Sequence, residues 1–289
     1  MTELEELQNR IKIFLRDKNK RGFRVFEGYS PTEMDQILYH PFAITSPIKF
    51  QKLSYADYQK IPILNQIKYL AKIIQDKGTL TLTAKGYLPT KIVADLYHQG
   101  FLKEFFIEEE YVKLIKEMDS MTVSLTRILL DLSRITKKRY GKLSLTKIGE
   151  KLLTDDDTLL RKILETFVNN FNWAYFDGYG ENYIGQLGFG FSLILLSKYG
   201  HEKRPDTFYA EKYFKAFPRL IEGIELKYDS AEDIAKRCYS LRTFDRFLDY
   251  FGLIDIDQQG DIKNSVKNIT VTDLFDRLIT IVPPSLENF

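Results

Sequence analysis

A short pattern recurs three times along this chain of 289 residues and limits the folds that the chain can adopt. The copies span residues 80–88, 143–153 and 269–279. Each copy alternates apolar and polar residues, reaches a threonine and continues with the apolar spacing of a helix. Alternation with a period of two buries one face of a strand, and a threonine hydroxyl accepts amide hydrogens that a new helix leaves free. We therefore expect three short hairpins that lead into helices capped at Thr83, Thr146 and Thr272.

Amphipathic helices are expected between these copies. For example, Pro62 opens and Gly78 ends a segment with apolar residues along one helical face. The middle copy follows a helical segment and a basic hairpin, which is the order of elements in a winged helix. The sequence thus predicts a mainly α fold with short β-hairpins, arranged as tandem winged-helix-like modules packed with connecting helices.

The pattern also suggests a division of the chain into four segments. We expect an N-terminal helical segment at 1–60 and a first winged-helix-like module at 61–119. A second module with aromatic connecting helices is predicted at 120–200, and a third module at 201–289. Within the first module, Glu108 to Glu110 precede apolar residues at helical spacing from Val112 to Met118, so a helix is expected to start there.

Composition excludes several classes of protein. The 42 basic and 40 acidic residues give a net charge of +2, so no global field attracts nucleic acid or an anionic membrane. A single cysteine, Cys238, excludes an internal disulfide, and the N-terminus lacks the pattern of a signal peptide. The longest apolar run, residues 184–196, is too short to cross a bilayer. We expect a cytoplasmic protein without a membrane partner.

No residues suggest a catalytic or metal site. His40, His98 and His201 lie far apart in the sequence and lack the spacing of metal ligands. Cys238 lies on the apolar face of an expected helix, which favours a buried thiol over a nucleophile. We expect no cofactor, no metal and no enzyme activity.

Residues 167–191 contain nine aromatic side chains among glycines. Large aromatic side chains bury much area, so this stretch favours a core between modules, with an aromatic ligand pocket as the alternative. We expect Trp173 to be buried where the second and third modules meet.

Basic residues concentrate around the middle hairpin. Residues 121–153 contain eight basic and two acidic residues. Five of the cations form the candidate nucleic-acid site, which we call the wing: Arg134, Lys137, Lys138, Arg139 and Lys142. Gly141 permits the reversal of the chain, so the wing should project into water. The third hairpin is nearly neutral, with Asp257, Asp261, Lys263 and Lys267, and should differ in its partner.

Four stretches carry a resemblance to a known family. They read Tyr-His-Pro-Phe at 39–42, Leu-Thr-Ala-Lys-Gly-Tyr-Leu-Pro at 82–89, Gly-Gln-Leu-Gly-Phe-Gly-Phe at 185–191 and Cys-Tyr-Ser-Leu-Arg-Thr-Phe at 238–244. With them the chain resembles an uncharacterised bacterial family of winged-helix-repeat proteins, similar to segments found alongside plasmid Orf-3-like proteins. The resemblance implies no catalytic residue.

Two hypotheses of function remain open. The first is a non-enzymatic interaction or scaffold protein built from winged-helix-like modules, which binds a protein partner. The alternative is a DNA-binding protein that contacts the phosphates of duplex DNA through the wing. Fold alone does not decide between them.

Overall fold

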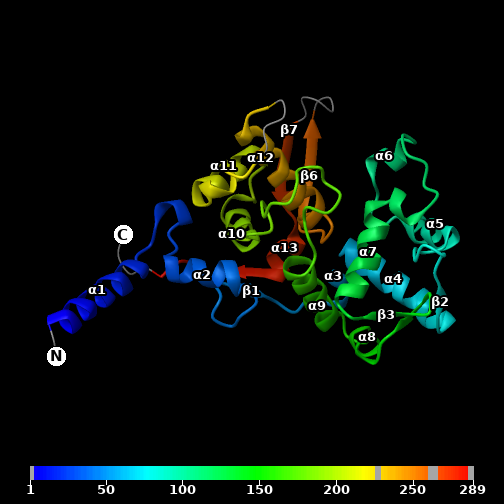
Figure 1. Cartoon of the computed structure of the whole chain (residues 1–289). Coiled ribbons are helices and arrows are strands. Elements are labelled where there is room, and N and C mark those ends of the chain that lie inside the picture. The colour runs from blue at the N-terminus through cyan, green and yellow to red at the C-terminus, as the bar shows by residue number, and fades with distance from the viewer. Residues whose placement is uncertain (1–2, 225–228, 260–265, 286–289) are drawn as a thin grey trace. The chain divides into compact units, whose positions relative to one another are not determined.

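The computed structural model describes residues 3–224, 229–259 and 266–285. Contacts divide the chain into two compact units. Unit 1 comprises residues 1–51, 179–246 and 254–289, and unit 2 comprises residues 52–178 and 247–253. Both units consist mainly of helices and also contain small antiparallel sheets (Figure 1). The prediction of a mainly α fold with short β-hairpins is confirmed.

Unit 2 is built from helices around one small sheet. Its elements are α3 (Tyr55–Tyr58), α4 (Pro62–Lys77), β2 (Leu80–Thr81), α5 (Thr90–His98), α6 (Phe105–Glu108), the 3₁₀ turn η2 (Glu117–Asp119), α7 (Met121–Leu132), β3 (Thr136–Arg139), β4 (Lys142–Leu145), α8 (Lys147–Leu152) and α9 (Asp156–Asn169). The sheet has the order β2-β4-β3. As predicted, α4 begins at Pro62, ends before Gly78 and buries one apolar face, which packs on α7.

The core of unit 2 includes an aromatic cluster. Trp173 is 2% exposed, and its indole N–H donates to the carbonyl of Phe167 at 2.9 Å. Its ring lies 5.3 Å from that of Phe167 and 5.0 Å from that of Phe247. The expected burial of Trp173 is confirmed, and core packing explains this part of the aromatic stretch.

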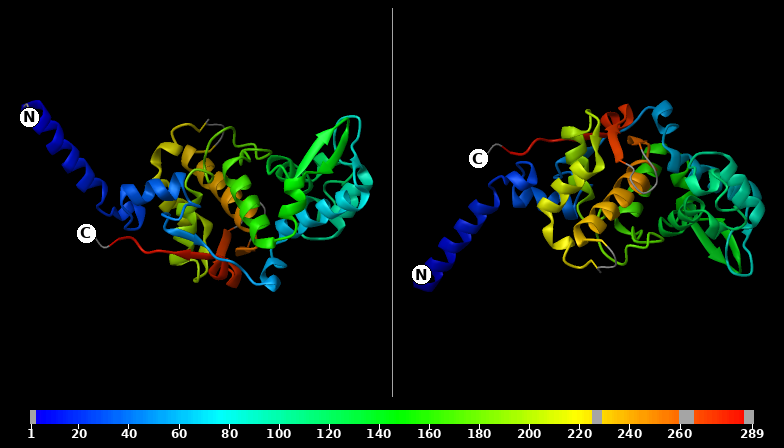
Figure 2. Two further views of the ribbon diagram at one scale, coloured as in Figure 1. Left: turned by 90° about the horizontal axis from the view of Figure 1, so that it is seen from below. Right: turned by 90° about the horizontal axis from the view of Figure 1, so that it is seen from above.

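Unit 1 contains a second sheet with the same strand order. Its elements are α1 (Glu3–Asn19), η1 (Arg24–Phe26), α2 (Pro31–Tyr39), β1 (Ile48–Phe50), α10 (Phe189–Tyr199), β5 (Arg204–Pro205), α11 (Asp206–Ala216), η3 (Pro218–Leu220), α12 (Ala231–Ser240), the π-helix η4 (Leu241–Leu248), β6 (Ile254–Gln259), β7 (Val266–Val271), α13 (Asp273–Leu278) and β8 (Ile279–Ile281). The last two residues of η4 belong to unit 2. The three-stranded sheet has the order β5-β7-β6, and β1 pairs with β8 (Figure 2).

The two three-stranded sheets therefore repeat one arrangement. In each, a strand that follows a long helix pairs with the second strand of a later hairpin. A short helix follows each hairpin, capped as predicted by a threonine: the Thr146 hydroxyl accepts from the amide of Gly149 at 2.9 Å, and that of Thr272 from the amide of Phe275 at 3.4 Å. The four predicted segments remain a prediction. We note that β2 and β4, expected in different modules, belong to one sheet.

The first copy of the repeated pattern differs from its prediction. Strand β2 makes no hairpin of its own, and Thr83 caps no helix. Instead the Thr83 hydroxyl accepts from the amide of Tyr87 at 3.0 Å, which closes a tight turn around Gly86 at φ +83°. Helix α5 starts only at Thr90, because Pro89 precedes it and ends the turn.

The predicted helix after Glu108 to Glu110 is also absent. The short helix α6 ends at Glu108, and Glu110 has a positive φ of 59°, which breaks the helix. Residues 111–116 form no helix. Val112 and Ile115 thus lie on an irregular segment, and Met118 lies in the turn η2.

Candidate functional site

The wing is a hairpin with a two-residue tip. Arg139 pairs with Lys142, and between them Tyr140 and Gly141 have positive φ values of 47° and 70°. Positive φ at both central residues is typical of a type I′ turn, which matches the twist of the strands. Tyr140 is 100% exposed at this tip. The expected projection of the hairpin tip into water is confirmed.

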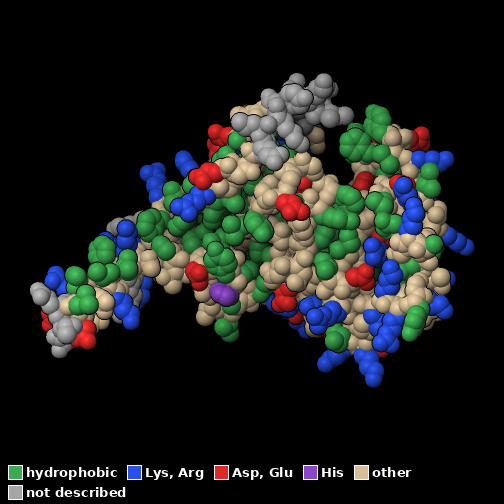
Figure 3. Space-filling view, in the orientation of Figure 1, with side chains coloured by type: hydrophobic (Ala, Val, Ile, Leu, Met, Phe, Trp, Pro, Cys, Tyr) green, Lys and Arg blue, Asp and Glu red, His purple; other side chains and the backbone are tan. Residues whose placement is uncertain are grey.

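The cations of the wing do not share one face. All five are exposed, and within the described ranges none pairs with a carboxylate. Lys138 lies opposite buried Leu143, and its amine lies over the turn at Gly86. Lys137 and Arg139 point to the other face of the hairpin, because side chains alternate along a strand. Arg134 lies before β3, at φ +59°. In Figure 3, Lys and Arg side chains gather around β3 and α8.

Helix α7 precedes the wing and is largely buried. Its N-terminus is covered by Glu104, whose carboxylate accepts from the amides of Met121 and Thr122, both at 3.0 Å. The hydroxyls of Ser120 and Thr122 also donate to this carboxylate. A helix N-terminus attracts anions, and Glu104 fills that place from within the chain.

A second carboxylate fixes the same segment. Glu117 is 1% exposed, and it accepts from the amide of Leu88 at 2.6 Å and from the guanidinium of Arg127 at 2.5 Å. Arg127 also pairs with Asp131 at 3.1 Å. The charge of Arg127 on α7 is therefore neutralised within the protein.

The segment between α5 and α7 exposes apolar side chains. We call residues 101–119 the arm. Its exposed large apolar residues are Phe105, Phe106, Tyr111, Val112, Ile115 and Met118. The rings of Phe105 and Phe106 lie 5.5 Å apart, and that of Tyr111 lies 6.2 and 6.3 Å from them. Figure 3 shows hydrophobic side chains gathered over α6. Exposed apolar clusters of this kind often mark interaction sites.

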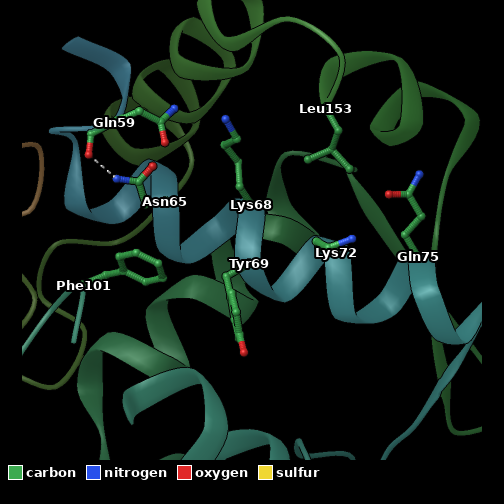
Figure 4. A pocket seen from close by; sticks show the side chains of 8 residues that line it. All are labelled: Gln59, Asn65, Lys68, Tyr69, Lys72, Gln75, Phe101 and Leu153. Carbon is green, nitrogen blue, oxygen red and sulfur yellow. Dashed lines mark hydrogen bonds between the residues drawn. The ribbon is translucent and has the colours of Figure 1, made fainter. Parts of the chain in front are cut away.

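Unit 2 also has an open pocket of about 440 Å³ along the outer face of α4 (Figure 4). Its lining residues are Gln59, Asn65, Lys68, Tyr69, Lys72, Gln75, Phe101 and Leu153. The amine of Lys68 is bound to Asp156 at 2.6 Å, and the hydroxyl of Tyr69 to Asp95 at 3.1 Å. Both polar groups are thus held by carboxylates of the same unit.

Other sequence candidates have plain structural roles. Cys238 is fully buried, as predicted. His201 lies on the surface, 3.7 Å from Asp276. Within the described ranges, no group of three or more His, Cys, Asp or Glu side chains could hold a metal ion. In the same ranges, no helix combines the length and apolar character needed to cross a membrane.

The sequence reasoning located the wing and missed the arm. The wing depends on local turn chemistry, which a short stretch of sequence specifies. Within the arm, the apolar residues from Val112 to Met118 have helical spacing and so predict a helix that the structure lacks. The run Glu108 to Glu110 ends the short helix α6 and does not start another helix.

Unit 2 thus combines a mainly helical fold with a basic hairpin and an apolar arm on its surface. Residues 59–158 match a family model described as the Y4jL N-terminal domain. The match runs from the turn before α4 to the start of α9 and so includes all three strands of the unit 2 sheet. No curated protein and no solved structure matches the chain.

Proposed function

We propose that the chain is a non-enzymatic interaction protein built from two winged-helix-like repeats, one in each unit. Two features support this reading. The two sheets share one strand order, and both units have the order helix, strand, helix, helix, hairpin once the short α6 and the η elements are set aside. In a winged helix, α7 would be the helix that enters the DNA groove with its N-terminus first.

The observation that carries the proposal is that the Glu104 carboxylate covers the N-terminus of α7. Glu104 occupies the amides that could otherwise bind a phosphate, and Glu117 neutralises Arg127. The arm that supplies both carboxylates presents the aromatic cluster of Phe105, Phe106 and Tyr111 to solvent. A surface suited to reading DNA is thereby replaced by one suited to binding protein.

The chemistry of the arm favours a particular kind of partner. Glu109 and Glu110 are exposed beside the aromatic cluster, and no ion pair holds either of them within the described ranges. A partner segment with an apolar face and basic side chains would bury the rings and pair with both carboxylates. We infer that the arm binds a basic amphipathic segment of another protein.

A pair of synthetic peptides tests this function. One is a labelled amphipathic helix of leucine and lysine, and the other has glutamate in place of lysine. We expect the native protein to bind the first peptide more tightly, by fluorescence anisotropy, and Phe106→Ser to weaken that binding. The control is Ile148→Ser, since Ile148 is similarly exposed, at 60% against 58% for Phe106. Equal binding of the two peptides, or an equal loss in the control, would overturn the assignment.

Contact with duplex DNA through the wing is the second candidate function. It is favoured by the exposure of all five wing cations and by their lack of carboxylate partners within the described ranges. With α7 closed, such contact would involve phosphates and carry little sequence preference. If four to six phosphates were neutralised, the log-log salt slope of binding would be about −4 to −5.

Replacing Lys137, Lys138, Arg139 and Lys142 together by Gln tests this second function. The variant should bind duplex more weakly and with a smaller salt slope, measured by anisotropy at two salt concentrations. Lys267→Gln in the other hairpin is the control and should do less. Lys263 and Asp261, also expected at that tip, lie outside the described residues. No binding by the native protein at low salt, or equal binding by the fourfold variant, would end this candidate.

A further inference from the structure

Among the residues that the structure describes, helix α1 has no buried side chain. Each of its side chains from Leu4 to Asn19 is exposed, apart from that of Arg16, which lies outside the described side chains. In Figure 2, no other element of unit 1 lies alongside α1. At the end of the helix, the hydroxyl of Thr32 donates to the carbonyl of Asn19 at 3.0 Å.

An isolated helix of this length is only marginally stable in water, since most helices depend on a packed apolar face. Helix α1 has 17 residues and carries large apolar side chains that are all at least half exposed. These side chains are Leu4, Leu7, Ile11, Ile13, Phe14 and Leu15. The helix therefore requires a partner surface to bury this area.

The spacing of these residues identifies the partner. Leu4, Leu7, Ile11 and Phe14 follow one another at intervals of three, four and three residues. This is the spacing of the two core positions in the heptad of a coiled coil, where one helix packs against another of the same kind. Ile13 lies outside this stripe.

The charges along α1 specify whether two such helices run parallel or antiparallel. Glu3, Glu5 and Glu6 make the start of the helix acidic, whereas its second half contains Arg10, Lys12, Arg16 and Lys18 against Asp17 alone. A parallel pair would bring like charges together, and an antiparallel pair brings the acidic end of one helix to the basic end of the other. The antiparallel arrangement also opposes the two helix dipoles favourably.

We propose that α1 binds α1 of a second copy of this chain as an antiparallel helix pair. Leu4 of one copy packs against Phe14 of the other, and Leu7 against Ile11, with the two-fold axis near Asn9. Such an interface is self-complementary, as a two-fold dimer requires. The remainder of each chain leaves α1 after Asn19, so the two bodies lie at opposite ends of the pair. The two Arg10 side chains meet near the axis, and salt screens this one exposed like-charged contact.

The mass of the full chain in solution tests the pairing. Light scattering after gel filtration should give twice the chain mass of 33.9 kDa. Leu7→Glu should raise the dissociation constant of the dimer by about 10-fold or more, since a charge enters the apolar stripe. Ile13→Glu is the matched control, because Ile13 is 52% exposed against 55% for Leu7 and lies off the stripe. Circular dichroism should show both variants folded.

Cysteine cross-linking tests the orientation. In a Cys238→Ala background, one protein with Leu4→Cys and another with Phe14→Cys are mixed and oxidised. The antiparallel pair should give the mixed disulfide in large excess over the Leu4→Cys homodimer. A parallel pair would give the two homodimers instead and would overturn the orientation.

Three results would overturn the pairing itself. The native chain could be a monomer at all concentrations, the control could dissociate as fully as Leu7→Glu, or a monomer could bind vesicles that contain anionic lipid. The last result would assign α1 to a membrane surface. None of these results depends on the arm or the wing, so the proposed function is tested separately.

Discussion

The β3–β4 and β6–β7 hairpins occupy the same place in two sheets of the same order but differ in their electrostatics. In β3–β4, the wing cations Lys137, Arg139 and Lys142 have no carboxylate partner among the residues described. In the other hairpin, Lys267 pairs with Asp245, and Asp257 pairs with Lys203. Strand order therefore fixes where a hairpin lies, and its side chains decide what it can bind.

The helices that precede the two hairpins differ in a related way. The N-terminus of α12 is capped locally by Ser230, which accepts from the amide of Asp233 at 3.1 Å. The N-terminus of α7 is capped locally by Ser120 and also receives Glu104 from the arm. Unit 2 thus uses a separate segment, the arm, to cover the N-terminus of α7, and this segment carries the apolar surface.

The largest expected effect concerns the position three residues after each capping threonine. Phe275 is fully buried, and Phe275→Ala should lower the unfolding free energy by about 4 kcal/mol through a cavity. The equivalent Gly149 has no room for a side chain, because an added Cβ would lie 2.2 Å from the carbonyl oxygen of Ile135. Gly149→Ala should cost about 2 kcal/mol through overpacking. Urea unfolding measures both, and two harmless substitutions would contradict the packing of both short helices.

The second comparison is between the carboxylates of Glu117 and Asp245, which pair with Arg127 and Lys267. Glu117→Gln should cost about 3 kcal/mol, because it leaves the charge of Arg127 without its buried partner. Asp245→Asn should change the unfolding free energy by less than about 1 kcal/mol at pH 7. The reason is that burial raises the pKa of the Asp245 carboxyl above its ordinary value, although Lys267 partly opposes this shift.

The pH dependence of the unfolding free energy shows whether the Asp245 carboxyl stabilises or destabilises the fold. Because folding raises its pKa, the carboxyl contributes stability that is fully present below pH 3.8 and is lost as pH rises through the raised value. The native protein should therefore lose stability relative to Asp245→Asn across that window. A native protein that instead gains stability over the variant as pH rises would show that the ion pair with Lys267 outweighs burial.

Local signals made much of the fold predictable. Ser30 forms a capping box with Glu33, and Asp155 caps α9 through the amide of Thr158. Such caps involve residues three positions apart, so the sequence contains all of their chemistry. The type I′ tip of the wing is local for the same reason.

Contacts between distant residues were not predictable from the sequence. Strand β2 pairs with β4 about 60 residues later, and nothing in the two-residue strand specifies that register. Glu104 reaches the amides of Met121 and Thr122 across the whole arm. The sequence therefore predicts the position of the wing. It does not predict that Glu104 covers the N-terminus of α7, and this contact counts against the DNA hypothesis.

A smaller effect is expected at the threonines. Thr146→Ala should cost about 1 kcal/mol, since its hydroxyl caps α8. Thr83→Ala should cost less, because the Thr83 hydroxyl is in an exposed turn and caps no helix. Chemical denaturation of both variants measures the difference. An equal loss at the two positions would show that helix capping is not the source of the effect.

The smallest effect on stability is expected in the wing. Exposed cations without partners contribute little to folding, so replacing Lys137, Lys138, Arg139 and Lys142 together by Gln should shift the unfolding free energy by less than about 0.5 kcal/mol. Lys267→Gln should cost more, although it removes one charge, because it deprives the half-buried Asp245 carboxylate of its partner. Urea midpoints for the two variants compare the hairpins directly. A larger loss in the fourfold variant would mean that the wing cations support the sheet, and the contrast between a free and an internally paired hairpin would then be wrong.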